Sequence, residues 1–203
     1  MRKTRHLEMP DRGKDKVFLI REMSALSFET WLLQAGEILS GKPDELFATA
    51  DTLSRQGITV LLRTGHASLP SLLSGLLHCC SLQEHERKIP LASDDVIDRY
   101  IDDVRCLFLL RRAGLNLHLQ FLATRRPLLF PKEQAFRRAM KATTYARPVN
   151  VPAVVGTLIN QGMASLGELE ERYSFEDALD MIELLNVRNY NQWATNETAK
   201  QRR

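Results

Sequence analysis

Cysteine is scarce in this chain, with three residues among 203. Two of them, Cys79 and Cys80, are neighbours and are poorly placed to bridge each other, and Cys106 stands apart. Nothing in this odd set indicates a disulfide framework. Because free cysteines are typical of reducing surroundings, we expect a reducing compartment.

Long hydrophobic runs are also absent. The basic N-terminus is followed by the apolar run 17–20, which is too short for the core of a signal peptide. No segment approaches the roughly 18 consecutive apolar residues that a membrane span needs. The composition, with 44% hydrophobic and 26% charged residues, is otherwise average for a globular chain. We therefore expect a soluble intracellular protein without a membrane partner.

The motifs of common catalytic sites are missing as well. Loops that bind phosphate need glycines at fixed spacings, and neither the dinucleotide-binding pattern nor the P-loop pattern occurs. The Gly-x-Ser-x-Gly elbow that presents a nucleophilic serine does not occur either. We expect a protein that is not an enzyme and that uses no cofactor.

Two groups contain residue types that ligate metals. The first group consists of His78, Cys79, Cys80 and His85. The second group consists of Asp94, Asp98 and Asp102. The His/Cys group lacks the paired cysteine spacings of structural zinc sites, and free cysteine is usually a small core residue. The three aspartates lie on one helix face at four-residue steps, which is also typical of a solvated acidic surface. We expect no metal site.

Charge is unevenly distributed although the net charge is only +3. Residues 105–147 contain ten basic residues and one acid, whereas residues 165–185 contain seven acids and one arginine. The two stretches can attract each other, can separate partners, or can simply be solvated helix faces.

The N-terminal part of the chain shows strand and then helix patterns. Residues 3–23 predict a β-hairpin, since Leu7 and Met9 alternate with polar residues before the turn-forming residues 11–14, and the run 17–20 after the turn is rich in strand formers. An isolated hairpin is marginally stable in water, so this one must pack on another element. Ser24 is suited to cap the next helix, and Gly41 is suited to end it.

A second helix is predicted to follow at once. It begins at Pro43 with Asp44 in its first turn, carries Phe47 in its apolar stripe and stops at Gly57. The next apolar run, 58–62, is compatible with strand or helix.

The middle of the chain predicts two further helices. One spans 69–80, and the other begins after Ser93 and stops at Gly114. Residues 115–122 fit a strand or a helix, and we favour a helix because the neighbouring segments are helical.

Three short helices are predicted near the C-terminus. The first ends near Gly162. Capping boxes then start the second at Ser165 and the third at Ser174, which runs through Leu185. The tail after Trp193 is expected to fray.

These elements predict a mainly α fold. We expect an N-terminal β-hairpin packed on a helical bundle over residues 1–126, a Pro/Arg-rich linker at 127–150 and a small C-terminal helical unit at 151–203. Residues 154–185 also have the outline of a helix-turn-helix module. Their third helix carries acids where phosphate contacts need Lys or Arg, so we do not expect a nucleic acid partner.

Two segments of the chain carry a resemblance to a known family. The first contains LEMPDRGK at 7–14, VFLIREM at 17–23 and Trp31, and the second is YSFEDALDMIE at 173–183. Together they resemble the tail assembly chaperones of long-tailed bacteriophages, in which a hairpin leads into a helix that bears Trp. The resemblance covers the two ends of the chain, and the middle matches in type only. The Cys79-Cys80 pair and the Arg-rich linker depart from the family.

The resemblance implies a non-catalytic protein of the host cell cytoplasm. Such a chaperone coats the tape measure protein until tail tube subunits replace it, and other tail proteins are further partners. A structural or connector protein of the tail, or a DNA-binding regulator, is the alternative. Homo-oligomer formation stays open.

The Leu-rich stripes are candidates for the contact with a partner, because such stripes can bury the amphipathic helix of another protein. The apolar candidates, each of which also fits a core position, are Phe28, Trp31, Leu72, Leu73, Leu76 and Leu77. Arginines of the basic stretch would steer an acidic or mixed-charge client. The candidates for this role are Arg111, Arg112, Arg137 and Arg138.

Overall fold

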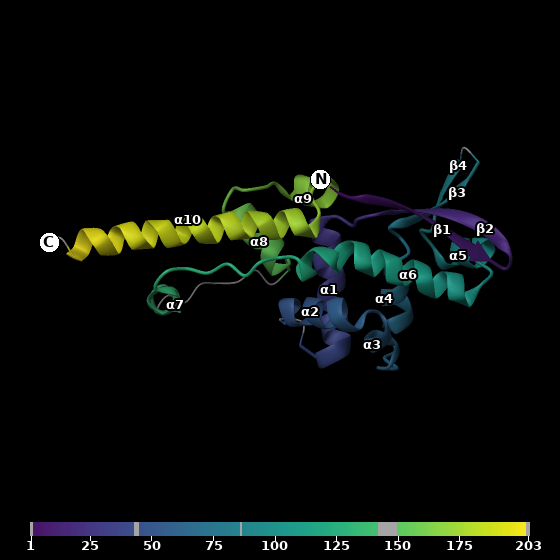
Figure 1. Ribbon diagram of the computed structural model, residues 1–203, viewed down its shortest axis with the longest axis horizontal. Coiled ribbons are helices and arrows are strands. Elements are labelled where there is room, and N and C mark those ends of the chain that lie inside the picture. The colour runs from purple at the N-terminus through teal and green to yellow at the C-terminus, as the bar shows by residue number, and fades with distance from the viewer. Residues whose placement is uncertain (1, 43–44, 86, 142–149, 202–203) are drawn as a thin grey trace.

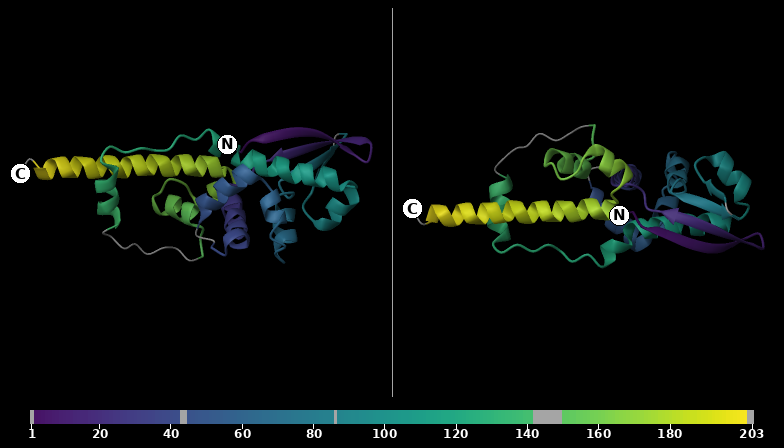
Figure 2. Two further views of the ribbon diagram at one scale, coloured as in Figure 1. Left: turned by 60° about the horizontal axis from the view of Figure 1, so that its bottom comes forward. Right: turned by 90° about the horizontal axis from the view of Figure 1, so that it is seen from above.

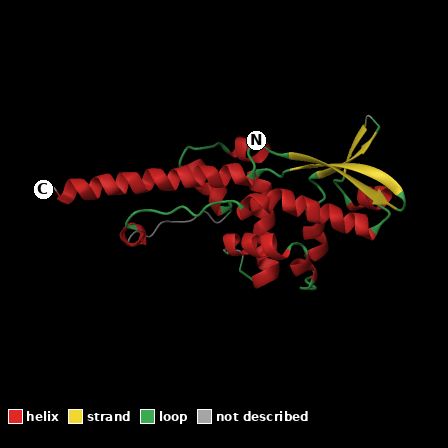
Figure 3. Ribbon diagram, in the orientation of Figure 1, coloured by secondary structure: helices red, strands yellow, loops and turns green. Residues whose placement is uncertain are grey.

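The computed structural model describes residues 2–42, 45–85, 87–141 and 150–201 (Figure 1). Within this part of the chain the fold is mainly α, with a four-stranded antiparallel sheet. Figure 3 shows the strands gathered at one end of the molecule and a long helix projecting at the other. The predicted fold class is confirmed.

The N-terminal hairpin forms as predicted. It consists of β1 (Thr4–Asp11) and β2 (Lys14–Arg21). Arg12 and Gly13 form its turn with φ angles of 48° and 80°. Positive φ at both central residues is the geometry whose twist matches that of two paired strands.

A second hairpin corrects the helix predicted over 69–80. Helix α4 (Leu69–Gly75) ends early, and β3 (Cys80–Glu84) and β4 (Arg87–Pro90) follow, in the sheet order β1-β2-β3-β4. Cys80 lies opposite Ile20 in the ladder between β2 and β3. The chain near Cys80 therefore forms a strand although its apolar pattern is helical, because β2 offers it main-chain hydrogen-bond partners. These partners are distant in the sequence, so the local pattern does not reveal them.

Helix α1 (Ala25–Ser40) has the predicted boundaries. The Ser24 side chain accepts a hydrogen bond from the Ser27 N–H, and Gly41 ends the helix with a φ of 66°. A left-handed residue at this position is most easily a glycine.

Two shorter helices follow α1. Helix α2 (Leu46–Gln56) stops at Gly57 as predicted, and the open segment 58–62 forms α3 (Thr59–Leu62). The predicted start of α2 at Pro43 and Asp44 lies outside the described residues.

The single helix predicted from Ser93 to Gly114 is wrong, because two helices occupy this region. They are α5 (Asp94–Tyr100) and α6 (Val104–Leu119), which continues into the 3-10 turn η1 (Gln120–Ala123). The break is stabilised by the buried carboxylate of Asp11, which accepts hydrogen bonds from the N–H groups of Asp102 and Asp103 at 3.1 and 2.7 Å. The helical interpretation of 115–122 is confirmed.

Gly114 lies inside α6 and does not end the helix. A Cβ at this position would lie 3.4 Å from the carbonyl oxygen of Leu76. Because Gly114 has no side chain, α6 can lie close to the segment after α4. This role depends on tertiary structure and cannot be read from the local sequence.

The C-terminal helices start as predicted. They are α8 (Ala153–Asn160), α9 (Leu166–Glu171) and α10 (Phe175–Gln201). The capping box of Ser165 and Glu168 is present, and Ser174 exchanges the same pair of bonds with Asp177. α10 continues past Trp193 to Gln201, so the third predicted helix is longer than expected, and the fraying of the tail stays a prediction. No Gly or Pro interrupts α10, and residues of these two types are the usual helix breakers.

The Pro/Arg-rich segment contains a helix of its own, α7 (Glu133–Lys141). Part of the predicted linker, 142–149, lies outside the described residues, as does Arg147 of the basic stretch. Figure 2 shows α7 beside the outer half of α10, which stands away from the rest of the molecule.

Two hydrophobic cores hold the molecule together. The larger one surrounds α1 and combines side chains from α2, α4, α8, α9 and α10. The smaller one lies between the sheet and helices α5 and α6. The helices at 151–203 thus share a core with α1, and the division of the chain into three regions stays a prediction. Among the described residues no helix has both the length and the apolar character needed to cross a membrane.

Candidate functional site

The six apolar candidates lie in the interior. Phe28 and Leu76 are fully buried, and the most exposed of the six, Trp31 and Leu73, each retain 5% of their surface. The Trp31 ring N–H donates to the carbonyl of Leu72 at 2.8 Å. The alternative that these residues belong to the core is confirmed, and as they lie they offer no surface to a partner.

The four candidate arginines are not gathered in one place. Arg111 and Arg112 lie on α6, whereas Arg137 and Arg138 lie on α7, at the other end of the molecule (Figure 1). Arg111 is partly buried, and burial lowers the pKa of its guanidinium although Asp94 acts in the opposite direction. Because the four side chains are dispersed, they form no single steering patch.

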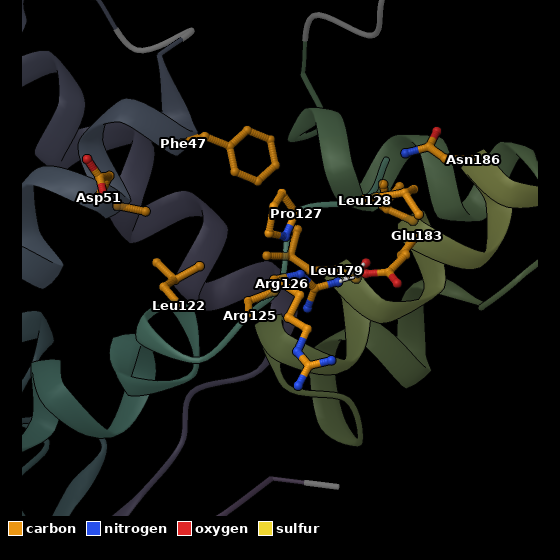
Figure 4. Close-up of a pocket in the computed structure, with 12 residues that line it drawn as sticks. Phe47, Asp51, Leu122, Arg125, Arg126, Pro127, Leu128, Leu179, Glu183 and Asn186 are labelled. Atoms are coloured by element: carbon orange, nitrogen blue, oxygen red, sulfur yellow. Dashed lines mark hydrogen bonds and ion pairs between the residues drawn. The ribbon is translucent and has the colours of Figure 1, made fainter. Parts of the chain in front are cut away.

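A different surface combines apolar contact with charge. It is a groove of about 370 Å³ between α2, the segment 122–128 and the first half of α10. Its apolar lining consists of Phe47, Ala50, Leu122, Pro127, Leu128, Leu179 and Ile182. Its polar lining consists of Asp51, Arg125, Arg126, Glu183 and Asn186. Figure 4 shows Phe47 on one side and Leu128 on the other, with Pro127 between them.

The position of Phe47 follows from the geometry of α2. Leu46, Ala50 and Leu53 recur at helical spacing and are buried in the core. Phe47 is one residue out of step with Leu46, so it points about 100° away and leaves the core face. It consequently retains 58% of its surface, an unusual exposure for a large aromatic side chain.

Arg125 fixes the other side of the groove. Its guanidinium donates to the Asp180 carboxylate at 2.7 Å, to the Glu183 carboxylate at 2.9 Å and to the carbonyl of Leu179 at 3.0 Å. These bonds hold the segment after η1 against α10. They also show that the basic and acidic stretches attract each other within the molecule at this point.

The charges at the groove balance, because three carboxylates and three arginines lie in it or beside it. Arg125 is compensated by two carboxylates, and Asp51 pairs with Arg55 at 3.0 Å. The neighbouring Arg126 is exposed, and no described residue pairs with its guanidinium. The groove therefore offers an apolar surface whose rim carries charges of both signs.

A cluster of aromatic rings lies beyond the groove, where α7 meets α10. Phe136 packs against Tyr190 and Trp193 with ring centroids 5.3 and 5.5 Å apart, and Phe130 stacks on Tyr190 at 4.7 Å. The Tyr190 hydroxyl donates to the carbonyl of Pro131. These contacts fasten the segment 127–141 to the outer half of α10.

Two buried polar side chains connect distant parts of the larger core. The Glu29 carboxylate accepts hydrogen bonds from the N–H groups of Val154 and Val155 at 2.7 and 3.0 Å, and so caps α8. Burial raises the pKa of Glu29, and these two bonds oppose the rise.

The second buried polar side chain is His118. Burial lowers the pKa of His118 to about 4. His118 accepts from the Met23 N–H through Nε2 at 2.6 Å.

The metal candidates are separated by the fold. His78 is exposed in the turn before β3, whereas His85 lies in the turn between β3 and β4. Cys79 and Cys80 are free, with Sγ atoms 3.9 Å apart, and the hydrogen bond with Cys79 together with burial raises the pKa of Cys80. Among the described residues, no three His, Cys, Asp or Glu side chains are grouped to hold a metal ion.

The sequence patterns did not reveal the groove. Phe47 was placed in the apolar stripe of its helix, and Arg125 was only one of ten basic residues in its stretch. The one available signal is the position of Phe47 next to Leu46, since neighbouring residues on a helix point about 100° apart and Phe47 can lie at the edge of the apolar stripe. Comparison of the chain with family models, with curated proteins and with solved structures finds no match.

Proposed function

We propose that the protein is a non-catalytic assembly chaperone of a long-tailed bacteriophage. In this role it binds the tape measure protein in the host cell cytoplasm and keeps it soluble until the tail tube polymerises. The proposal begins from the resemblance of residues 7–23 with Trp31, and of residues 173–183, to that family.

One observation carries the proposal: the two ends of the chain that the resemblance covers meet in space, through residues that flank the first matching segment and residues of the second. The Ala25 N–H, at the start of α1, donates to the carbonyl of Tyr173 at 2.8 Å. Phe28 of α1 packs against Phe175 of α10 with ring centroids 5.5 Å apart. Lys3, just before β1, forms an ion pair with Glu176. The two segments thus form one structural unit, as parts of a shared family framework would.

The groove supports a binding role for this unit. It lies along the first half of α10, the helix that contains most of the second segment, and it combines the exposed Phe47 with charged side chains of both signs. Apolar surface with a charged rim is typical of sites that bind other proteins.

The test is a pull-down with the tagged full-length protein from phage-producing cells, with partners identified by mass spectrometry. Recovery of the tape measure protein, and absence of the tagged protein from mature particles, would support the chaperone. Presence in particles as a stoichiometric component would instead identify a structural or connector protein. Salt-sensitive binding to duplex DNA, without tail proteins, would identify a regulator.

Co-expression gives a second measurement that needs no infection. The tape measure protein is expressed alone, with the full-length protein, and with the Phe28→Ala variant as a control whose core is weakened. We expect the soluble fraction to rise only with the wild-type partner. Equal solubility in all three expressions would contradict the proposal.

A further inference from the structure

We infer that the adjacent thiols of Cys79 and Cys80 form a binding site for a soft monovalent metal ion, Cu(I), held between the two sulfur atoms. The site lies where the turn after α4 enters β3. It is separate from the groove, and it is independent of the proposed function because it requires no other protein.

The local fold brings the two sulfur atoms together. Neighbouring side chains of a strand point to opposite faces, and those of a helix diverge by about 100°. Cys79 follows neither pattern because it lies in a turn, whereas Cys80 is the first residue of β3. Their Sγ atoms are 3.9 Å apart, and both lie within hydrogen-bond distance of the carbonyl oxygen of Leu76, at 3.0 and 3.6 Å. The two sulfur atoms therefore face a common point in the folded chain.

The distance between the sulfur atoms fits one shared ion and does not fit a disulfide. A disulfide needs about 2.05 Å between its sulfur atoms, and both cysteines are free. A zinc–thiolate bond is about 2.3 Å long, and two bonds of this length bridge sulfur atoms up to about 4.6 Å apart. At 3.9 Å, one ion of similar size can therefore bond both sulfur atoms while Cys80 keeps its place opposite Ile20 in the sheet.

The number of donor groups selects the ion. Among the described residues, no third His, Cys, Asp or Glu side chain joins the pair. Structural zinc sites and iron–sulfur clusters take four protein ligands, so two thiolates are too few for either. Cu(I) is a soft ion that thiolates select, and it is stable with only two ligands. The zinc spacings that the sequence lacks are therefore no argument against Cu(I).

The pair is reached from a cavity of about 400 Å³ beside α1. Cys79 lines this cavity and is partly exposed, whereas Cys80 does not line it and retains 1% of its surface. An ion that enters the cavity therefore meets Cys79 first and Cys80 second. The charged lining residues, Arg2 and Glu170, have opposite signs, so the softness of sulfur and not charge decides which ion binds.

Binding replaces two protons by one ion. The hydrogen bond with Cys79 and burial raise the pKa of the Cys80 thiol, so this thiol keeps its proton until a metal ion takes its place. Each thiol releases one proton to water as its sulfur donates an electron pair to the metal. Copper stays Cu(I) throughout, so the step needs no oxidant or reductant.

Competition with a coloured chelator tests the site. The reduced full-length protein is titrated anaerobically with Cu(I) in the presence of bicinchoninate, whose Cu(I) complex absorbs visible light. We expect the protein to retain one Cu(I) per chain. Loss of a second-shell partner of a metal site costs about 10–100-fold in affinity, so loss of a ligand in Cys79→Ala or Cys80→Ala should cost more than about 100-fold. Cys106→Ala is the matched control, because this buried cysteine belongs to no group of metal ligands among the described residues.

Thermal unfolding shows whether the folded chain presents the site. An ion that binds the native protein more tightly than the unfolded chain raises the unfolding temperature. One equivalent of Cu(I) should therefore raise the unfolding temperature of the wild type and of Cys106→Ala, and should leave that of Cys79→Ala unchanged. Because Cys79 is only partly buried, we expect Cys79→Ala to fold, and circular dichroism checks this.

The inference is overturned if the wild type yields all of its Cu(I) to the chelator, or if Cys79→Ala and Cys80→Ala retain the ion as Cys106→Ala does. It is also overturned if Cu(I) binds and the unfolding temperature does not rise, since the ion then binds the unfolded chain equally well. Loss of the ion from the two variants, together with a stabilised wild type, establishes the site. None of these results depends on recovery of the tape measure protein, so failure of the site and failure of the proposed function are distinguishable.

Discussion

Helices α1 and α10 differ in how they are held, although both are long and uninterrupted. In α1 the buried residues extend from Ala25 to Gly36, over most of the 16 residues of the helix. In α10, which has 27 residues, the buried residues are Phe175, Ala178, Leu179 and Leu185. Every one of these lies in its first half.

The comparison teaches that helix formation and helix anchoring are separate properties. α1 is surrounded in the larger core by side chains from α2, α3, α4, α6, α8, α9 and α10, so its stability comes from packing. The outer half of α10 is contacted on one face, where Phe136 of α7 packs against Trp193 of α10. Its stability depends more on local propensity and on that single contact. Disrupting α1 should therefore unfold the protein, whereas disrupting outer α10 should not.

The largest effect is expected from Phe28→Ala. Phe28 is fully buried and packs against Trp31, His118 and Phe175. Removal of the ring leaves a cavity and should lower the free energy of unfolding by about 3–5 kcal/mol. Urea unfolding measures this change.

The matched control is Leu184→Ala on α10, where the side chain is 65% exposed. It should change the free energy of unfolding by less than about 0.5 kcal/mol. Similar losses in the two variants would show that α1 and α10 are anchored alike.

A smaller but still substantial effect is expected from Glu29→Ala. Its carboxylate is the acceptor for two N–H groups at the start of α8, and the substitution leaves both donors buried without it. We expect a loss of about 2–4 kcal/mol in the free energy of unfolding. Glu37→Ala, an exposed site on the same helix, is the control and should be nearly neutral. A neutral Glu29→Ala would show that α8 does not depend on α1.

His118 should make stability depend on pH. Its pKa is lowered from 6.5 to about 4 in the folded protein, so the unfolded chain binds more protons between these values. Stability from this residue is therefore fully present above about pH 6.5 and is lost as the pH falls toward 4. Between pH 7 and pH 5 the loss should be about 2 kcal/mol.

The measurement compares the wild type with His118→Gln, which cannot titrate, by urea unfolding at both pH values. The carboxylates of Glu22 and Glu29, whose pKa values burial raises, titrate in both proteins and cancel in the difference. Arg2, the charged group that acts on His118, is also present in both. Parallel pH profiles for the two proteins would refute the assignment.

The smallest global effect is expected from Trp193→Ala in outer α10. The Trp193 ring contacts Phe136 and Tyr190, and aromatic pairs of this kind contribute about 0.5–1.5 kcal/mol each. The loss should appear locally, as faster hydrogen exchange in α7 and outer α10, with little change in the exchange of α1. Gln192→Ala, at the exposed neighbouring position, should leave α7 unchanged. Faster exchange throughout α1 would contradict the separation of the two regions.

Elements defined by nearby residues could be predicted. The turn at Arg12 and Gly13, the cap at Ser24 and the capping box of Ser165 each depend on groups a few positions apart. The strand at Cys80 could not be predicted in this way, because its ladder partner is Ile20. The same holds for the break between α5 and α6, which depends on Asp11.

The candidate site illustrates the same limit. The apolar stripes predict faces that avoid water, but burial inside the molecule and burial against a partner produce the same pattern. Phe28 and Trp31 turned out to be interior, whereas Phe47 is exposed. Only the folded structure distinguishes these cases.

The sequence by itself determined the class of fold, the N-terminal hairpin and most helix starts, because caps, turns and apolar periodicity act over a few residues. Tertiary structure decided where α6 begins, which strands complete the sheet and which aromatic residue faces solvent. It also assembled the groove, whose lining comes from Phe47, from the segment near Pro127 and from Ile182. Contacts between residues so far apart in the chain form only when the whole core closes, so no local pattern records them.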